Sequence, residues 1–473
     1  MLGGATGLLM ALGALQVLQA LGPAEVRGVD GLGLDLPVLA FAAAMSFLAA
    51  LAAGTGPAMR ATRVDIREAL HAGNSPGSLR GRLTGALIVG QVALALVLLA
   101  TSGLLLRSFV ELLRVHPGFR SDRVAVLQVF MWGHYPQAQE RIEYFRRAHE
   151  KLTAVAGVEA VGGVSALPFL GESSIAISVP IHIEGSPPTA EGEAPMVHST
   201  VATTDYFRSM AIPLIRGRGF ASSDTREAPR IALVNETMAR RFWPGQDPVG
   251  RRFSILGRQP MVLEVAGVVG DVLHTGMDTA ARPEFFRPFL QAPFGSLTFV
   301  VHTTRDPRSE LPALKSALWE INNRIPFWSA TTMEDLVSGT LAERRFIAML
   351  IGLFSALALL LAAVGVYGIV SYATSRRTRE MGVRLTLGAV PRDILALVLR
   401  QGLRLPGLGT GLGLLAAVGV SRLLTGHLFG VQPFDPVSYL AAAGLMGLAA
   451  LCACYFPARR AARLDPAASL RHE

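Results

Sequence analysis

The stretch SRRTREMGVRLTLGAVPRD, residues 375–393, is a polar island between two apolar runs. From Ala373 to Arg404 the sequence holds seven Arg against two acidic residues. The flanking runs Phe346–Tyr372 and Leu405–Ser421, of 27 and 17 residues, are long enough to cross the hydrocarbon core of a bilayer, for which a helix needs about 20 residues. The island is therefore predicted to connect two membrane spans.

The composition of the whole chain agrees with a membrane protein. Its 473 residues are 51% hydrophobic and only 17% charged, and their mean hydropathy of +0.41 is too high for an ordinary soluble chain. With the two runs above, the sequence predicts about six spans, the other four being Leu2–Gly22, Pro37–Gly56, Thr84–Leu106 and Val437–Phe456.

The distribution of charge predicts an orientation. A net charge of +9 would by itself suggest nucleic acid, but the Arg residues gather in alternate links between the spans. Residues 57–82 hold five Arg against two acids, whereas the short links 23–36 and 425–436 together hold one Arg and four acids. By the positive-inside rule, residues 373–395 and the C-terminus are predicted to be cytoplasmic and residues 107–344 to lie outside. No nucleic-acid partner is expected.

An internal repeat divides the chain. PAMRATRVDIREAL, residues 57–70, and PARRAARLDPAASL, residues 457–470, are identical at seven of fourteen positions, and each follows an apolar run. This indicates duplication. Residues 1–75 would be the last two spans and basic tail of an incomplete first unit, which suggests a fragment or a misassigned start. The complete unit would comprise a linker and first span (76–106), an outside domain (107–344) and three spans with a cytoplasmic loop 373–395 (345–473).

The outside segment is predicted to be a mixed α/β domain, because strand-like runs such as RVAVLQVFM alternate with helix-like runs such as QAQERIEYFRRAHEKLTAV. At its edges, apolar residues keep helical spacing beyond Leu106 and before Phe346. The first span and the span Phe346–Tyr372 are therefore expected to continue as long helices. Asn235 in the sequence NET could accept a glycan, but we favour a cap for the helix ETMARRFW.

Sequence signs of catalysis are scarce. A phosphate-binding P-loop needs a Gly-Lys pair, and the two lysines of the chain follow Glu150 and Leu314. His149 has no second histidine four residues later to complete a zinc-protease helix. Cys452 and Cys454 lie in the last apolar run and are interpreted as packing residues. We expect no enzyme activity, no metal and no cofactor.

The island nevertheless resembles a known motif. TREMGVRLTLGAVPRDI is similar to the cytoplasmic signature of FtsX-like ABC transporter permeases, and residues 203–224 and 234–253 resemble the periplasmic core domain of MacB-like permeases. The partial copy upstream resembles the duplicated MacB-like permeases common in acidobacteria. Six residues match the cytoplasmic signature and are the candidate ATPase-coupling residues: Glu380, Gly382, Arg384, Leu387, Gly388 and Ala389.

The resemblance implies a multi-pass, non-catalytic permease of a bacterial inner membrane, working in export or efflux. The loop would dock on a separate ATPase subunit, which would bind the ATP, and the motion would reach the periplasmic domain. Other implied partners are membrane lipids, a periplasmic adaptor, and a second permease unit in a homodimer or pseudo-dimer. The alternatives from the residues are a membrane-anchored periplasmic binding or scaffold protein without an ATPase, and an extracytoplasmic enzyme, for which no catalytic constellation is visible.

Overall fold

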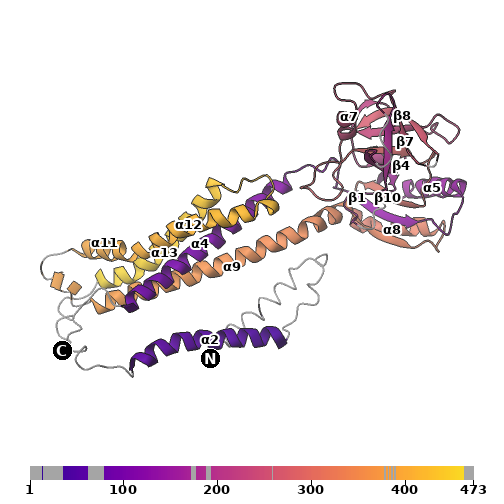
Figure 1. Ribbon diagram of the computed structural model, residues 1–473. Coiled ribbons are helices and arrows are strands. Elements are labelled where there is room, and N and C mark those ends of the chain that lie inside the picture. Colours follow the sequence, from indigo (N-terminus) through magenta and orange to yellow (C-terminus); the bar gives the residue numbers. More distant parts are fainter. Residues whose placement is uncertain are drawn as a thin grey trace. The chain divides into compact units, whose positions relative to one another are not determined.

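The structure is a computed structural model, and two compact units make up the chain. The helical unit is Met1–Leu112 together with Ala342–Glu473, and the sheet unit is Leu113–Leu341 (Figure 1). The residues that the structure describes are 13, 36–61, 79–171, 177–187, 193–257, 259–377, 380–381, 383–384, 387 and 390–462.

The helical unit contains long apolar helices. Their bounds are α2 (Leu36–Ala61), α4 (Leu79–Leu113), α9 (Met333–Arg376), α11 (Pro391–Gly402), α12 (Arg404–Leu423) and α13 (Pro436–Ala462), with a 3-10 turn, η2 (Thr425–His427). Among the described residues, four stretches are long and apolar enough to cross a membrane: Thr84–Leu113, Met333–Arg376, Pro391–Leu423 and Pro436–Ala462.

The prediction of six spans is therefore confirmed only in part. Apart from Gly13, the expected span Leu2–Gly22 lies outside the described residues. The expected span Pro37–Gly56 lies within α2, whose described apolar part, Leu36–Leu48, is shorter than a span.

Close helix contacts hold the helical unit together. Helices α4, α9, α11, α12 and α13 share one apolar core. A methyl group added at Gly413 of α12 would lie 2.9 Å from the Cα of Ala93 in α4. Between α4 and α9, the Ser355 hydroxyl donates to the Leu98 carbonyl at 2.8 Å. Small residues at such contacts allow helix backbones to approach closely in lipid.

The described part of the sheet unit is built on one sheet of eleven strands, which confirms the mixed α/β prediction. The order is β11-β1-β10-β2-β4-β3-β7-β8-β6-β9, and β5 pairs with β8. The strands are β1 (Val124–Phe130), β2 (Val158–Val164), β3 (Ile177–Ile183), β4 (Met196–Ala202), β5 (Leu214–Gly217), β6 (Ile231–Asn235), β7 (Arg252–Ile255), β8 (Met261–Val269), β9 (Glu284–Pro288), β10 (Ser296–Thr303) and β11 (Phe327–Thr332).

Two apolar cores lie on this sheet. Helices α5 (Ala138–Thr153) and α8 (Pro307–Trp319) pack on the part that contains β1, β2 and β10, with Phe299 in their core. Helix α7 (Glu236–Phe242) packs on β6, β8 and β9, and its core holds Phe253 and Phe285. A short helix, α6 (Tyr206–Ser209), lies against β2. Most strand pairs are antiparallel, but β4–β9 and β6–β8 are parallel.

The two helices expected to be long are continuous. Helix α4 runs past Leu106 to Leu113, and α9 begins before Phe346, at Met333. The 44 residues of α9 span about 66 Å at 1.5 Å per residue. Its first turn is capped, since Asp335 N donates to the Thr332 hydroxyl at 3.1 Å and that hydroxyl donates to the Asp335 carboxylate at 2.8 Å.

Candidate functional site

The predicted coupling residues lie between α9, which ends at Arg376, and α11, which begins at Pro391. Of the six, Glu380, Arg384 and Leu387 are described by the structure. The other three, Gly382, Gly388 and Ala389, lie outside the described residues, so their role stays a prediction.

Glu380 and Arg384 form an ion pair one helical turn apart. Arg384 Nη2 donates to Glu380 Oε1 at 2.7 Å, and both side chains are about half exposed. An exposed pair at this spacing contributes only about 0.3–0.5 kcal/mol. The pair therefore adds little to stability, and both charged groups remain open to water.

Met381 anchors this segment and is not among the residues predicted from the sequence. Its side chain is 5% exposed and belongs to the same core as Val370 of α9 and Ile394 and Val398 of α11. The signal was present, because Met381 is an apolar residue directly after a run of charged residues. Leu387 behaves in the opposite way: it is 82% exposed. The segment thus combines a buried anchor with an exposed apolar side chain.

Helix α11 begins at Pro391. Proline is favoured at the first helical position because that residue needs no N–H donor there. Ile394 and Val398 form its buried face, and Arg392 and Arg400 are exposed. Just after α9, Arg377 donates to the Gln401 side chain in α11 at 2.9 Å. The end of α9 and the amphipathic α11 are therefore linked by apolar and polar contacts.

A second polar contact of the helical unit joins α4 to the link before α13. Arg107 forms an ion pair with Asp435. The same carboxylate caps α13, accepting from Ser438 N at 3.0 Å and from the Ser438 hydroxyl at 2.6 Å. Asp435 is one of the acidic residues in the short links from which the membrane orientation was predicted. The same residue also connects α4 to the start of α13.

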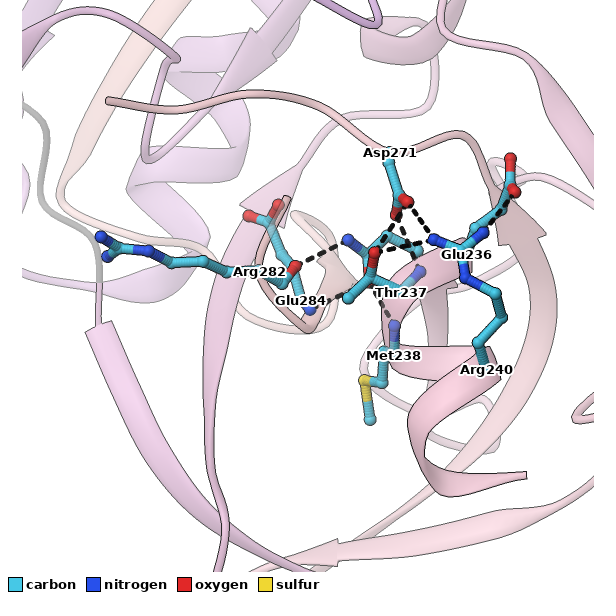
Figure 2. Close-up of polar contacts among 8 residues, drawn as sticks. Glu236, Thr237, Met238, Arg240, Asp271, Arg282 and Glu284 are labelled. Carbon is cyan, nitrogen blue, oxygen red and sulfur yellow. Dashed lines mark hydrogen bonds and ion pairs between the residues drawn. The ribbon is translucent and has the colours of Figure 1, made fainter. Parts of the chain in front are cut away.

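In the sheet unit, the motif that begins at Val234 is centred on Asn235. The Asn235 side chain accepts from Met238 N at 2.9 Å, which confirms the predicted helix cap. It also accepts from Glu284 N at 3.0 Å and donates to the Arg282 carbonyl at 2.8 Å (Figure 2). At 1% exposure, Asn235 is too buried to accept a glycan.

Asp271 completes this network. Its carboxylate accepts from Thr237 N at 2.8 Å, from the Thr237 hydroxyl at 2.7 Å and from Arg240 at 2.7 Å. Arg240 also contacts Glu236 at 2.9 Å (Figure 2). These bonds tie α7 to the loop after β8, so the polar residues of the motif hold the fold of this unit.

Comparison with known proteins assigns both units. The model of the MacB-like periplasmic core domain matches residues 84–315, and the model of the FtsX-like permease C-terminal domain matches residues 352–466. The chain belongs to the MacB-like permeases. It is thus an ABC transporter permease with an FtsX-like membrane domain, and its sheet unit is a periplasmic core domain.

Curated relatives of this MacB-like permease are longer proteins. The macrolide export ATP-binding/permease protein MacB of Rhodospirillum rubrum is 29% identical over 275 residues, covering 55% of this chain and 41% of the relative. The pyoverdine export ATP-binding/permease protein PvdT of Pseudomonas savastanoi pv. phaseolicola is 26% identical over 273 residues, covering 55% and 40%. The matched region thus corresponds to about two fifths of these relatives.

Among solved structures, the periplasmic region of MacB from Actinobacillus actinomycetemcomitans aligns with 48% of this chain and 95% of its own. The identity is 13% and the TM-score 0.32. Within the part of the chain that the structure describes, no group of three or more His, Cys, Asp or Glu residues is placed to hold a metal ion.

Proposed function

We propose that this MacB-like permease is the non-catalytic membrane part of an ABC exporter and transmits the motion of an ATPase to its periplasmic core domain. Both relatives above are named as export proteins with ATP-binding and permease functions. The 473 residues of this chain contain no Gly-Lys pair for a P-loop. ATP would therefore be bound by a protein segment outside these residues.

The observation that carries the proposal is the contrast between Met381 and Leu387. An apolar side chain that is 82% exposed on a link between helices is suited to pack against a partner protein. Six residues earlier, Met381 is buried against α9 and α11. A force applied at Leu387 would therefore be passed to the end of α9 through a packed contact rather than lost in a loosely held link.

Helix α9 would carry this displacement further. Residues 333–341 of α9 belong to the sheet unit and its remaining residues to the helical unit. An unbroken helix resists bending and stretching, because each residue is bonded to the next turn. Axial motion at Arg376 would thus reach Met333, and the signal needs no passage of substrate through the helices.

The proposed function also implies contacts with lipids and with other proteins. Leu360 and Leu361 of α9 are 60% and 57% exposed, as expected for side chains that contact lipid tails. We place the chain in a bacterial inner membrane with its C-terminus in the cytoplasm, and infer a second permease unit and a periplasmic adaptor as further partners. The alternative of a scaffold protein without an ATPase is not favoured by the match to export proteins.

The test compares two leucines of equal exposure. Leu387→Ser is purified together with ABC ATPases from the same genome, and ATPase binding and ATP hydrolysis are measured. Loss of one buried leucine contact, about 1.5–3 kcal/mol, should weaken ATPase binding roughly tenfold or more. Leu423→Ser is the control, because Leu423 is 83% exposed at the end of α12 away from the coupling segment.

Equal loss in both variants would remove the coupling role from Leu387, and so would unchanged ATPase binding in Leu387→Ser. A combined Glu380→Ala, Gly382→Ala and Gly388→Ala variant tests the other predicted residues in the same assay. Reporter fusions at residues 220 and 385 test the orientation. Finding residue 385 outside the cytoplasm would overturn the proposal.

A further inference from the structure

The periplasmic core domain contains a cavity of about 200 Å³ with a charged floor. Apolar side chains of Leu167 and Phe169 form one wall. His198, His274, Arg282 and Glu284 supply the polar groups. Charged side chains are seldom buried without a specific reason, so a cavity that ends on them is a candidate binding site.

Glu284 supplies the one carboxylate among the lining residues of the cavity. The residue is 2% exposed, and both of its oxygens are engaged. Oε1 accepts from the Thr200 hydroxyl at 2.5 Å, and Oε2 lies 2.8 Å from His274 Nε2. In the parallel pairing of β4 and β9, His198 lies directly opposite Glu284. The carboxylate is therefore already neutralised by the protein and is not available to a cationic ligand.

The other groups make the cavity electropositive. Burial opposes the imidazolium form of His274, but the charge and hydrogen bond of Glu284 outweigh burial and raise the pKa of His274 above its usual value. Burial is the main cause that lowers the pKa of His198. The nearby charges of Arg282 and His274 lower this pKa further, whereas the charge of Glu284 raises it. Arg282 is exposed and always charged. His274, whose pKa is raised, and the guanidinium of Arg282 thus accompany the one carboxylate among the lining residues.

The backbone around the cavity is held in place and locally strained. Asn235 bonds to the backbones of both Arg282 and Glu284, and their side chains point away from the Asn235–Asp271 network (Figure 2). Phe169 has a φ of +60°, which is unfavourable for a residue with a side chain, and its N–H donates to the His274 carbonyl at 2.8 Å. Such strain gathers at binding sites, where the surrounding structure enforces it.

We propose that this cavity binds a small carboxylic acid with an apolar body. The carboxylate would lie toward Arg282 and the two histidines, and the apolar part would pack on Leu167 and Phe169. Thr340 of α9 also lines the cavity, so the occupant would contact the helix that the proposed function assigns to force transmission. The binding site itself does not depend on that function.

The test uses 4-fluorobenzoate as probe and the full chain in lipid nanodiscs, with ¹⁹F NMR to follow binding. We expect saturable binding of 4-fluorobenzoate and none of 4-fluorobenzylamine, which has a similar shape and the opposite charge. Binding should be tighter at pH 5.5 than at pH 8, because the pKa of His274 is raised and this histidine gains charge on acidification.

Three variants locate the site. Arg282→Gln should weaken binding about tenfold, the effect of losing one charged hydrogen bond. Thr275→Trp should abolish binding by filling the cavity, of which Thr275 is a lining residue. Arg226→Gln, at an exposed arginine elsewhere in the same domain, should change nothing. Tryptophan fluorescence melting shows that each variant is folded.

Several results would overturn the proposal. They are absence of saturable 4-fluorobenzoate binding, equal binding of the amine, and an equal effect of Arg282→Gln and Arg226→Gln. A failure here leaves the proposed function standing, because ATPase binding at Leu387 is measured separately.

Discussion

The two units of this permease are packed by different kinds of side chain. The core of the periplasmic domain is rich in large residues, and Phe253, Phe285 and Phe299 are fully buried in it. In the helical unit, contacts are made where residues are small, as at Gly409 and Gly413 of α12 against α4. Many of its large apolar side chains point outward.

The difference follows from the solvent. In water, burial of an aromatic side chain is favourable because apolar area leaves water. In lipid that gain is absent, since the tails are as apolar as leucine, and close backbone approach with good van der Waals contact takes over. Removal of a large side chain should thus destabilise the periplasmic domain most. Addition of a side chain to a glycine at a helix contact should destabilise the helical unit most.

The chain offers a separate probe for each unit. All four tryptophans, at positions 132, 243, 319 and 328, lie in the periplasmic core domain. Cys454, which is 0% exposed, lies in α13 of the helical unit. Tryptophan fluorescence therefore reports unfolding of one unit, and the rate of thiol labelling at Cys454 reports opening of the other. A Cys452→Ser background removes the exposed thiol.

The largest effect is expected from Phe285→Ala. The Phe285 ring packs edge-on against Phe253 with centroids 5.0 Å apart. Its loss should lower the free energy of unfolding of the periplasmic domain by about 3–5 kcal/mol. Tryptophan fluorescence should show a lower melting temperature while Cys454 labelling stays the same. Phe456→Ala, at a ring that is 58% exposed in α13, should leave both readouts almost unchanged.

Gly413→Ala tests the opposite unit. The added methyl would lie 2.9 Å from the backbone of Ala93, and relief of this overlap should cost about 1–3 kcal/mol. Cys454 labelling should accelerate without a change in the tryptophan transition. Gly411→Ala is the matched control, because nothing lies within 4 Å of its added methyl. Similar labelling rates in the two variants would contradict the close-approach account.

Asn235→Ala should have an intermediate effect on the periplasmic domain. It removes the cap of α7 and the bonds to the backbones of Arg282 and Glu284, at a cost of about 1–2 kcal/mol. The fluorescence transition should shift to lower temperature. Asn235→Asp keeps the two acceptor bonds but places a carboxylate oxygen against the Arg282 carbonyl, so it should also destabilise the domain. An unchanged fluorescence transition in Asn235→Ala would contradict this role of the Asn235 side chain.

The smallest expected effect is a change in the pH dependence of the melting temperature. The pKa of His274 is raised in the folded domain, so its pairing with Glu284 stabilises fully below the ordinary histidine pKa and is lost as pH rises through the raised value. His274→Gln should therefore lower the melting temperature more at pH 6 than at pH 9. His198→Gln should show the reverse trend, because the pKa of His198 is lowered by burial and its stabilisation is lost on acidification. The same pH trend in both variants would refute this assignment.

Much of the architecture could be predicted from local sequence. The span-length helices followed from uncharged runs, and the mixed α/β domain from alternating strand-like and helix-like patterns. The Asn235 cap was also predicted, because a helix cap depends on neighbouring residues. The coupling motif was recognised by resemblance, and its glycines stay untested.

The tertiary structure alone decided which distant residues meet. Burial of Met381 depends on two helices that flank its segment, and the cavity in the periplasmic domain gathers residues from Leu167 to Thr340. Thr200 and Glu284, 84 positions apart, are brought together by the parallel pairing of β4 and β9. Periodicity and composition describe each segment by itself, whereas strand order and packing depend on all segments at once. The sequence by itself thus determined the helices and strands, and only the fold decided which residues line the cavity.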